Sequence, residues 1–239
     1  MTARHGAPLE NASGGSTAGH RGPPAPHGGR GATRVGSRRD RLRRASGALH
    51  RDLEARLEGA GSFDSLDGYA RYLGAVAPLH AALEGMLDAA GAGRLLPDWP
   101  RRRKAALIRA DLRALGAAGA GTRVPHPIPD AGLPKPWHSG AVLAALYVLE
   151  GATLGGAVLA RRVLRFGATR ERGAASLDPY GPDRGAMWRG FLGALEGAAL
   201  TPEEEADLGP RAVAVFALFA ARVPAPVPAA PLRPGPVPA

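Results

Sequence analysis

The feature of this sequence that most constrains its fold is a helical spacing of apolar residues through most of its 239 residues. Large apolar side chains recur three or four residues apart, which is typical of the buried face of an α-helix, whereas period-two alternation of any length is absent. The spacing predicts helices over residues 42–57, 69–87, 97–115, 138–166, 185–198 and 201–219. We therefore predict an all-α fold.

Local signals support the predicted helix ends. Gly116 follows the third apolar stripe and is expected to act as a C-cap. The last stripe opens with the pattern of a capping box, formed by Thr201 and Glu204. Pro202 adds a second start signal, because proline is favoured at the first helical position. These signals predict where the third helix ends and where the last helix begins.

The composition divides the chain into one domain and two tails. Residues 1–38 are rich in Gly, Pro, Ser, Ala and Arg and carry too little apolar surface to offset the entropy of ordering. Residues 224–239 are rich in proline and are expected to be extended. We predict disorder in both tails and a single domain over 39–223, which contains a Pro-rich loop at 123–136.

Cysteine usage and hydropathy limit the classes of protein. The chain has no cysteine, which excludes disulfides, iron–sulfur clusters, thiolate ligation and cysteine-based zinc sites. The first forty residues lack the apolar stretch of a signal peptide, so we expect a cytoplasmic protein. Residues 141–160 have the length of a membrane span, but Glu150 and the many small residues favour a buried helix in a soluble bundle, and we predict no membrane association.

The net charge of +10 is compatible with nucleic acid, a membrane surface or an acidic protein as a partner. The charge is spread along the chain, and no zinc finger, RNP-type aromatic pattern or basic leucine zipper is present, so we expect no nucleic-acid binding. The run from Arg101 to Lys104 lies in a predicted helix and is interpreted as a solvated face.

Two histidines in the predicted helices differ in their surroundings. His50 lies at the edge of the first apolar stripe, within a turn of Ser46 and Leu53. It is either a satisfied structural histidine or a ligand of a metal or haem, since imidazole is the commonest such ligand. His80 is expected to be a packed or surface histidine, and His138, beside the Pro-rich loop, is expected to face water.

Three glycines interrupt the most apolar helix, at Gly151, Gly155 and Gly156. Each glycine within a helix costs about 1 kcal/mol relative to alanine, so three within six residues require a reason. Either the glycines allow close packing against another helix, or they allow a flat ligand to lie against the backbone. The sequence around them leaves both explanations open.

The ordered motifs of the chain resemble one family. Residues 42–54, LRRASGALHRDLE, resemble the proximal helix of haem oxygenases, and residues 147–156, YVLEGATLGG, resemble the distal helix of their bacterial, phytochrome-associated branch. Smaller matching blocks are Pro97-Asp98-Trp99, Arg103-Lys104, Asp111-Leu112, Leu115-Gly116, Tyr180-Gly181, Met187-Trp188 and Phe191. The blocks occur in the expected order over about residues 40–220, and the ordered set is far more specific than any one block.

This resemblance implies a haem-oxygenase-like helical bundle that cleaves haem with O2 to biliverdin, CO and iron. It implies that His50 is the proximal iron ligand, that Arg43 contacts a haem propionate, and that Gly151, Gly155 and Gly156 lie over the distal face as the catalytic segment. A ferredoxin- or flavodoxin-like protein would supply electrons, with the Arg101–Lys104 run as one docking option. Biliverdin would be handed to a phytochrome.

The chain also departs from the family pattern. Ala152 stands where many haem oxygenases carry Asp and this branch usually carries Ser, so a group that orders water is missing there. Thr153 could supply a hydroxyl, or it could bond its own helix backbone. Residues 176–179 replace two expected aromatic residues. The alternatives are therefore a non-catalytic haem carrier or sensor on the same fold, a same-fold protein for another small molecule, or a basic scaffold.

Overall fold

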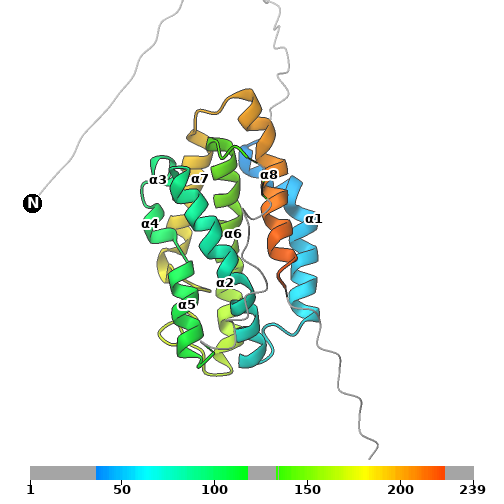
Figure 1. Ribbon diagram of the computed structural model, residues 1–239, viewed down its shortest axis with the longest axis vertical. Coiled ribbons are helices and arrows are strands. Elements are labelled where there is room, and N and C mark those ends of the chain that lie inside the picture. The colour runs from blue at the N-terminus through cyan, green and yellow to red at the C-terminus, as the bar shows by residue number, and fades with distance from the viewer. Residues whose placement is uncertain (1–35, 118–132, 134, 224–239) are drawn as a thin grey trace, which may run out of the picture. The chain divides into compact units, whose positions relative to one another are not determined.

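The computed structural model describes residues 36–117, 133 and 135–223. The elements in these ranges are α1 (Arg38–Gly59), α2 (Leu66–Ala89), α3 (Ala92–Leu95), α4 (Trp99–Arg102), α5 (Ala105–Ala114), α6 (Ser139–Leu164), the 3₁₀ turn η2 (Gly181–Asp183), α7 (Arg184–Gly197) and α8 (Pro202–Ala220) (Figure 1). Isolated bridges around Thr169 are the only β-type pairing in the described ranges. The prediction of an all-α fold is thereby confirmed. Residues 1–35, the C-terminal tail and most of the Pro-rich loop lie outside these ranges, whereas the predicted N-terminal tail extends too far, because Ser37 caps α1 and Arg38 belongs to it.

Side chains and one glycine set the helix ends as expected from local chemistry. The hydroxyl of Ser37 accepts from Asp40 N at 3.1 Å and caps α1, and Ser65 caps α2 by accepting from Gly68 N at 3.0 Å. Thr201 forms the predicted capping box at the start of α8. Gly116 follows Leu115, the C-cap of α5, and adopts a φ of 70°, the left-handed conformation that ends a helix and that its predicted role requires.

The predicted single helix over 97–115 is wrong, because the chain breaks between α4 and α5. Arg103 is extended, with φ −71° and ψ 133°. The backbone N–H groups of Lys104 and Ala105 donate to Oε1 of Glu84 on α2, at 2.6 and 2.8 Å. A buried carboxylate from another helix thus satisfies the first N–H groups of α5, and the chain gains a new helix start there.

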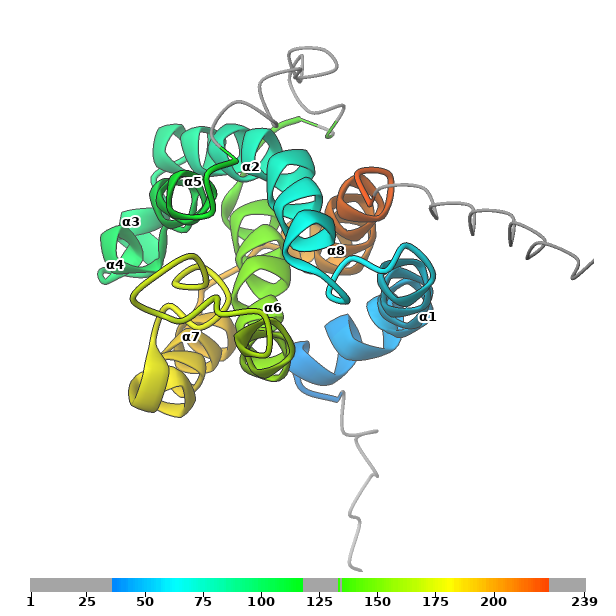
Figure 2. The ribbon, with the colours of Figure 1, turned by 90° about the horizontal axis from the view of Figure 1, so that it is seen from below.

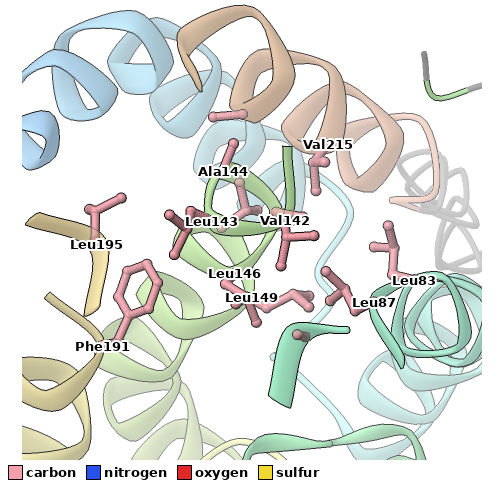
Figure 3. Packing of buried hydrophobic residues seen from close by; sticks show 14 of the residues in the cluster. Leu83, Leu87, Val142, Leu143, Ala144, Leu146, Leu149, Phe191, Leu195 and Val215 are labelled. Carbon is pink, nitrogen blue, oxygen red and sulfur yellow. The ribbon is translucent and has the colours of Figure 1, made fainter. Parts of the chain in front are cut away.

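The core surrounds the N-terminal half of α6, which lies at the centre of the bundle between α2, α7 and α8 (Figures 1 and 2). Figure 3 shows how apolar side chains from these four helices meet there. The labelled residues are Leu83, Leu87, Val142, Leu143, Ala144, Leu146, Leu149, Phe191, Leu195 and Val215. α6 is long and apolar enough to cross a membrane, yet 61% of its most apolar stretch is buried inside the protein. This burial agrees with the expectation that residues 141–160 form a buried helix of the bundle.

A second apolar cluster packs the opposite end of α6 against α2 and α5. It includes Phe63, Leu73, Ile108, Leu112 and Val163. α1 is held differently, because it packs mainly along α8 and is tied at its start by ion pairs of Arg38 and Arg41 with Glu205. α8 therefore packs against both α1 and α6, and a cavity lies between those two helices.

Candidate functional site

A cavity of about 600 Å³ lies between α1 and α6, with α2 and α8 contributing to its walls. Figure 2 shows the arrangement of these four helices in a view along α6. Much of the lining is apolar, from Leu53, Leu57, Leu73, Val76, Leu154, Leu159, Phe216 and Phe219. A cavity of this size with mainly apolar walls suits a large, mostly apolar small molecule.

The glycines of α6 present two different environments. A Cβ atom added at Gly151 or Gly155 would meet no atom within 4 Å, so both backbone positions face open space at the cavity. A Cβ at Gly156 would lie 2.1 Å from the carbonyl oxygen of Leu177, far inside van der Waals contact. Gly151 and Gly155 therefore fit the flat-ligand explanation, whereas Gly156 is required for close packing of a loop, although it also borders the cavity.

His50 reaches the same cavity from α1. Its side chain is 55% exposed, with Nδ1 3.5 Å from Oε2 of Glu54. Its ring lies 6.0 Å from that of Phe216 on α8 in an edge-on arrangement. His50 is therefore not a histidine packed in the core, and its imidazole is available to a ligand in the cavity.

The rim of the cavity on α1 is basic. The cavity is bordered there by three exposed residues, Arg39, Arg43 and Arg51. Guanidinium groups bind carboxylates with paired hydrogen bonds. The rim can therefore hold an anionic group of a ligand whose apolar part lies deeper.

A buried ionic network fixes α6 directly before Gly151. Glu150 accepts from Arg102 Nη1 at 2.5 Å and from Lys104 Nζ at 2.9 Å. The hydroxyl of Tyr180 donates to the same carboxylate, 2.9 and 3.0 Å from its two oxygens. Burial and the charge of Glu150 raise the pKa of Tyr180, so this hydroxyl stays protonated as a donor.

Comparison with known proteins decides the family. The family model described as Heme oxygenase matches residues 38–224. The chain belongs to the haem oxygenase family. It is 30% identical over 176 residues to "Heme oxygenase PigA" of Pseudomonas aeruginosa, covering 72% of this chain and 84% of that protein. It is 33% identical over 165 residues to "Heme oxygenase" of Xanthomonas campestris pv. campestris, covering 67% of this chain and 91% of that protein.

Solved structures agree with this assignment. The NO- and CO-bound haem oxygenase of Neisseria meningitidis matches with a TM-score of 0.65 and 25% identity, over 78% of this chain and 90% of that one. Heme oxygenase 2 of Chlamydomonas reinhardtii matches with a TM-score of 0.59 and 22% identity over 79% and 96%, which supports the fold alone. The predictions of a haem oxygenase fold and of a haem-degrading enzyme are confirmed.

In this haem oxygenase the structure brings all the predicted site residues to one cavity. Arg43, His50 and the three glycines of α6 border it together. Their roles toward haem stay predictions. The hydroxyl of Thr153 donates to the carbonyl oxygen of Glu150 at 2.6 Å, so of its two alternatives the bond to its own helix is the one observed.

The interpretation of Arg101 to Lys104 as a solvated face is wrong for two of its four members. The side chain of Arg102 is 1% exposed and that of Lys104 is 6% exposed, because both neutralise Glu150 inside the bundle. Arg103 remains half-exposed and pairs with Asp88 at 2.8 Å. The spacing of residues in the sequence did not predict this network. The available signal was Glu150, because an acidic residue in the most apolar helix needs buried partners.

The other histidines also differ from one another. His80 was expected to be either packed or on the surface, and it is packed, with its ring 5.2 Å from that of Phe219. It also borders the cavity. Burial, followed by the charge of Lys104, lowers the pKa of His80 to about 3. His138 is partly exposed, as the expectation that it faces water allows, and it also caps α6 by accepting from Ala141 N at 3.2 Å and lies 3.1 Å from Asp207.

Proposed function

We propose that this chain binds haem in the cavity between α1 and α6, with His50 as the axial ligand of the iron, and cleaves it to biliverdin, CO and iron. One observation carries the proposal. The half-exposed imidazole of His50 and the open glycine face of Gly151 and Gly155 border one cavity from two different helices. A planar macrocycle between them has a nitrogen ligand on one side and bare backbone on the other.

The remaining lining supports haem as the substrate. The apolar walls suit the porphyrin ring, and the arginine rim on α1 suits its two propionates. Arg43 lies two turns before His50 on the same helix, so it extends from the side that carries the ligand. We assign the propionate contact to Arg43, with Arg39 and Arg51 beside it.

The protein contributes orientation more than acid–base chemistry. Haem is the substrate, and it brings both the iron that binds O2 and the carbon that is oxidised. His50 fixes the ring from one side. Gly151 and Gly155 keep side chains away from the other side, so O2 fits there in a narrow space against the ring.

Electrons and product transfer require partners. A ferredoxin- or flavodoxin-like protein supplies the electrons, and its acidic surface suits a chain of net charge +10. Arg102 and Lys104 are buried, so the exposed arginines of α1 are the better docking site. A phytochrome receives the biliverdin, as the resemblance to the phytochrome-associated branch implies. The enzyme works in the cytoplasm.

A carrier or sensor that binds haem without cleaving it is the second candidate. It is favoured by Ala152, which offers no hydroxyl at the position where the family orders water. The two candidates share the binding site and differ only in turnover.

One experiment separates them. Purified protein is mixed with hemin, the Soret band is recorded, and a ferredoxin system or ascorbate is then added under air. We expect the Soret band to decay into the broad red band of biliverdin. A stable Soret band would support the carrier, and the lack of any Soret band would contradict haem binding. His50→Ala should lose the native haem spectrum and regain it with added imidazole, which controls for misfolding.

A further inference from the structure

The cavity has a basic end and an apolar end along α1. Arg43 borders it seven residues before His50, and Leu57 borders it seven residues after His50. At the rise of an α-helix these two residues are about 20 Å apart along the helix. Because His50 lies midway, a ring that it holds with the propionates at Arg43 turns its opposite edge toward Leu57.

Tyr72 of α2 borders the cavity at this apolar end. α2 begins at the end of the bundle where α1 finishes (Figure 1). Tyr72 and Leu57 both pack against the apolar cluster that contains Phe63, and the rings of Tyr72 and Phe63 are 5.1 Å apart. The side chain of Tyr72 therefore lies at the end of the cavity opposite the arginine rim.

The hydroxyl of Tyr72 is an available hydrogen-bond donor. It has no hydrogen-bond partner in the described ranges, and unlike the hydroxyl of Tyr69 it is not closed off, since Tyr72 is only partly buried. Burial raises the pKa of Tyr72 to about 12, so the hydroxyl stays protonated at neutral pH. A few placed polar groups in a mainly apolar pocket fix the orientation and specificity of its ligand.

The other hydroxyls that border the cavity are engaged, closed off or at the basic end. Ser46 and Thr153 donate to carbonyl oxygens of their own helices, at 2.8 and 2.6 Å. The Oγ of Ser176 is closed off by packing. The hydroxyl of Tyr147 lies near the arginine rim. Within the described part of the chain, Tyr72 therefore supplies the available hydroxyl at the apolar end.

Haem has no acceptor for this donor. The edge of haem opposite its propionates carries vinyl and methyl groups, which accept no hydrogen bond. Opening the ring at the meso carbon of that edge leaves a carbonyl oxygen on each of the two terminal rings of biliverdin. A site that bonds a polar group of one ligand discriminates against a ligand that lacks it. The position of Tyr72 therefore suits the product better than the substrate.

We propose that the hydroxyl of Tyr72 donates a hydrogen bond to a terminal carbonyl oxygen of biliverdin opened at the meso carbon opposite the propionates, and so binds the product selectively. The inference rests on the proposed function, since that function places the propionates of haem at Arg43. It also assigns the position of ring opening, because biliverdin opened at another meso carbon carries these oxygens on a different edge.

The test compares Tyr72→Phe with the natural protein, both as the full chain, in titrations with hemin and with biliverdin opened at that meso carbon. The variant keeps the ring that packs on Phe63, and loses only the hydroxyl. Loss of one neutral hydrogen bond should weaken biliverdin binding about fivefold and leave hemin affinity unchanged. The infrared band of the terminal carbonyl groups of bound biliverdin should move to higher wavenumber in the variant.

Tyr147→Phe is the matched control, because it removes a hydroxyl from the same cavity at the arginine rim. Hemin and biliverdin both carry propionates, so this change should alter both affinities by the same factor and leave the carbonyl band in place.

Three results would overturn this inference alone. They are an unchanged biliverdin affinity or carbonyl band in Tyr72→Phe, a loss of hemin affinity as large as that of biliverdin affinity, and natural protein that binds hemin but no biliverdin. Natural protein that binds no hemin would overturn the proposed function as well.

Discussion

Two adjacent glycines of α6 allow the two explanations for its glycine segment to be separated by the same substitution. Gly155→Ala places a methyl group in open space at the cavity, while Gly156→Ala places it 2.1 Å from the carbonyl oxygen of Leu177. Both changes occur inside one helix and add the same atoms. Gly155→Ala should nevertheless stabilise the haem-free protein, whereas Gly156→Ala should leave its stability unchanged or lower it.

The magnitudes follow from the structure. Each substitution gains about 1 kcal/mol of helix propensity. Because this gain is common to both, the difference between the variants isolates the contact with Leu177. Forcing an extra methyl group into a packed interior costs about 1–3 kcal/mol, and the loop cannot yield easily because Asp111 holds Ala175 and Ser176. Gly156→Ala should therefore be about 1–3 kcal/mol less stable than Gly155→Ala.

Urea unfolding of the haem-free variants, followed by circular dichroism, measures this difference, and a Soret titration measures hemin affinity. Gly155→Ala should be more stable than the natural protein and should bind hemin more weakly, because its methyl group occupies space assigned to the ring. Equal stabilities of the two variants would refute the close contact at Gly156. Unchanged hemin affinity of Gly155→Ala would refute the placement of the ring.

Two further predictions concern buried titratable groups. Glu150→Gln leaves Lys104 and one side of Arg102 without a carboxylate, so it should lower the free energy of unfolding, measured with urea, by about 3 kcal/mol. The control Asp52→Asn removes an exposed carboxylate and should change this free energy by less than about 0.5 kcal/mol. His80 has its pKa lowered to about 3, so below pH 6.5 the unfolded chain takes up a proton that the native state does not. Stability should fall by about 1.4 kcal/mol per pH unit between pH 6 and 4 through this residue, and parallel pH curves for natural protein and His80→Leu would count against it.

The helices of the fold could be predicted because their information is local. The stripe that becomes α2 buries Leu73, Leu83 and Leu87 along one face, and the capping box at Thr201 needs only neighbouring residues. The break at Arg103 could not be predicted in this way. It depends on Glu84 from another helix, which offers its carboxylate to the start of α5.

The candidate site was predictable mainly through the family resemblance. A histidine at the edge of a stripe and glycines in an apolar helix drew attention to His50, Gly151, Gly155 and Gly156, but each kept a structural explanation until the resemblance favoured a site. The buried pairing of Arg102 and Lys104 with Glu150 was hidden, because four basic residues in a row are normally solvated and only tertiary packing buries two of them.

The most direct test of the account is a crystal structure of the natural protein with hemin bound. We predict that the iron is bonded to the imidazole of His50, that the ring lies against the backbone of Gly151 and Gly155, and that its propionates reach Arg43 on α1. Iron bonded to His80, or a ring bound outside the cavity between α1 and α6, would contradict the account.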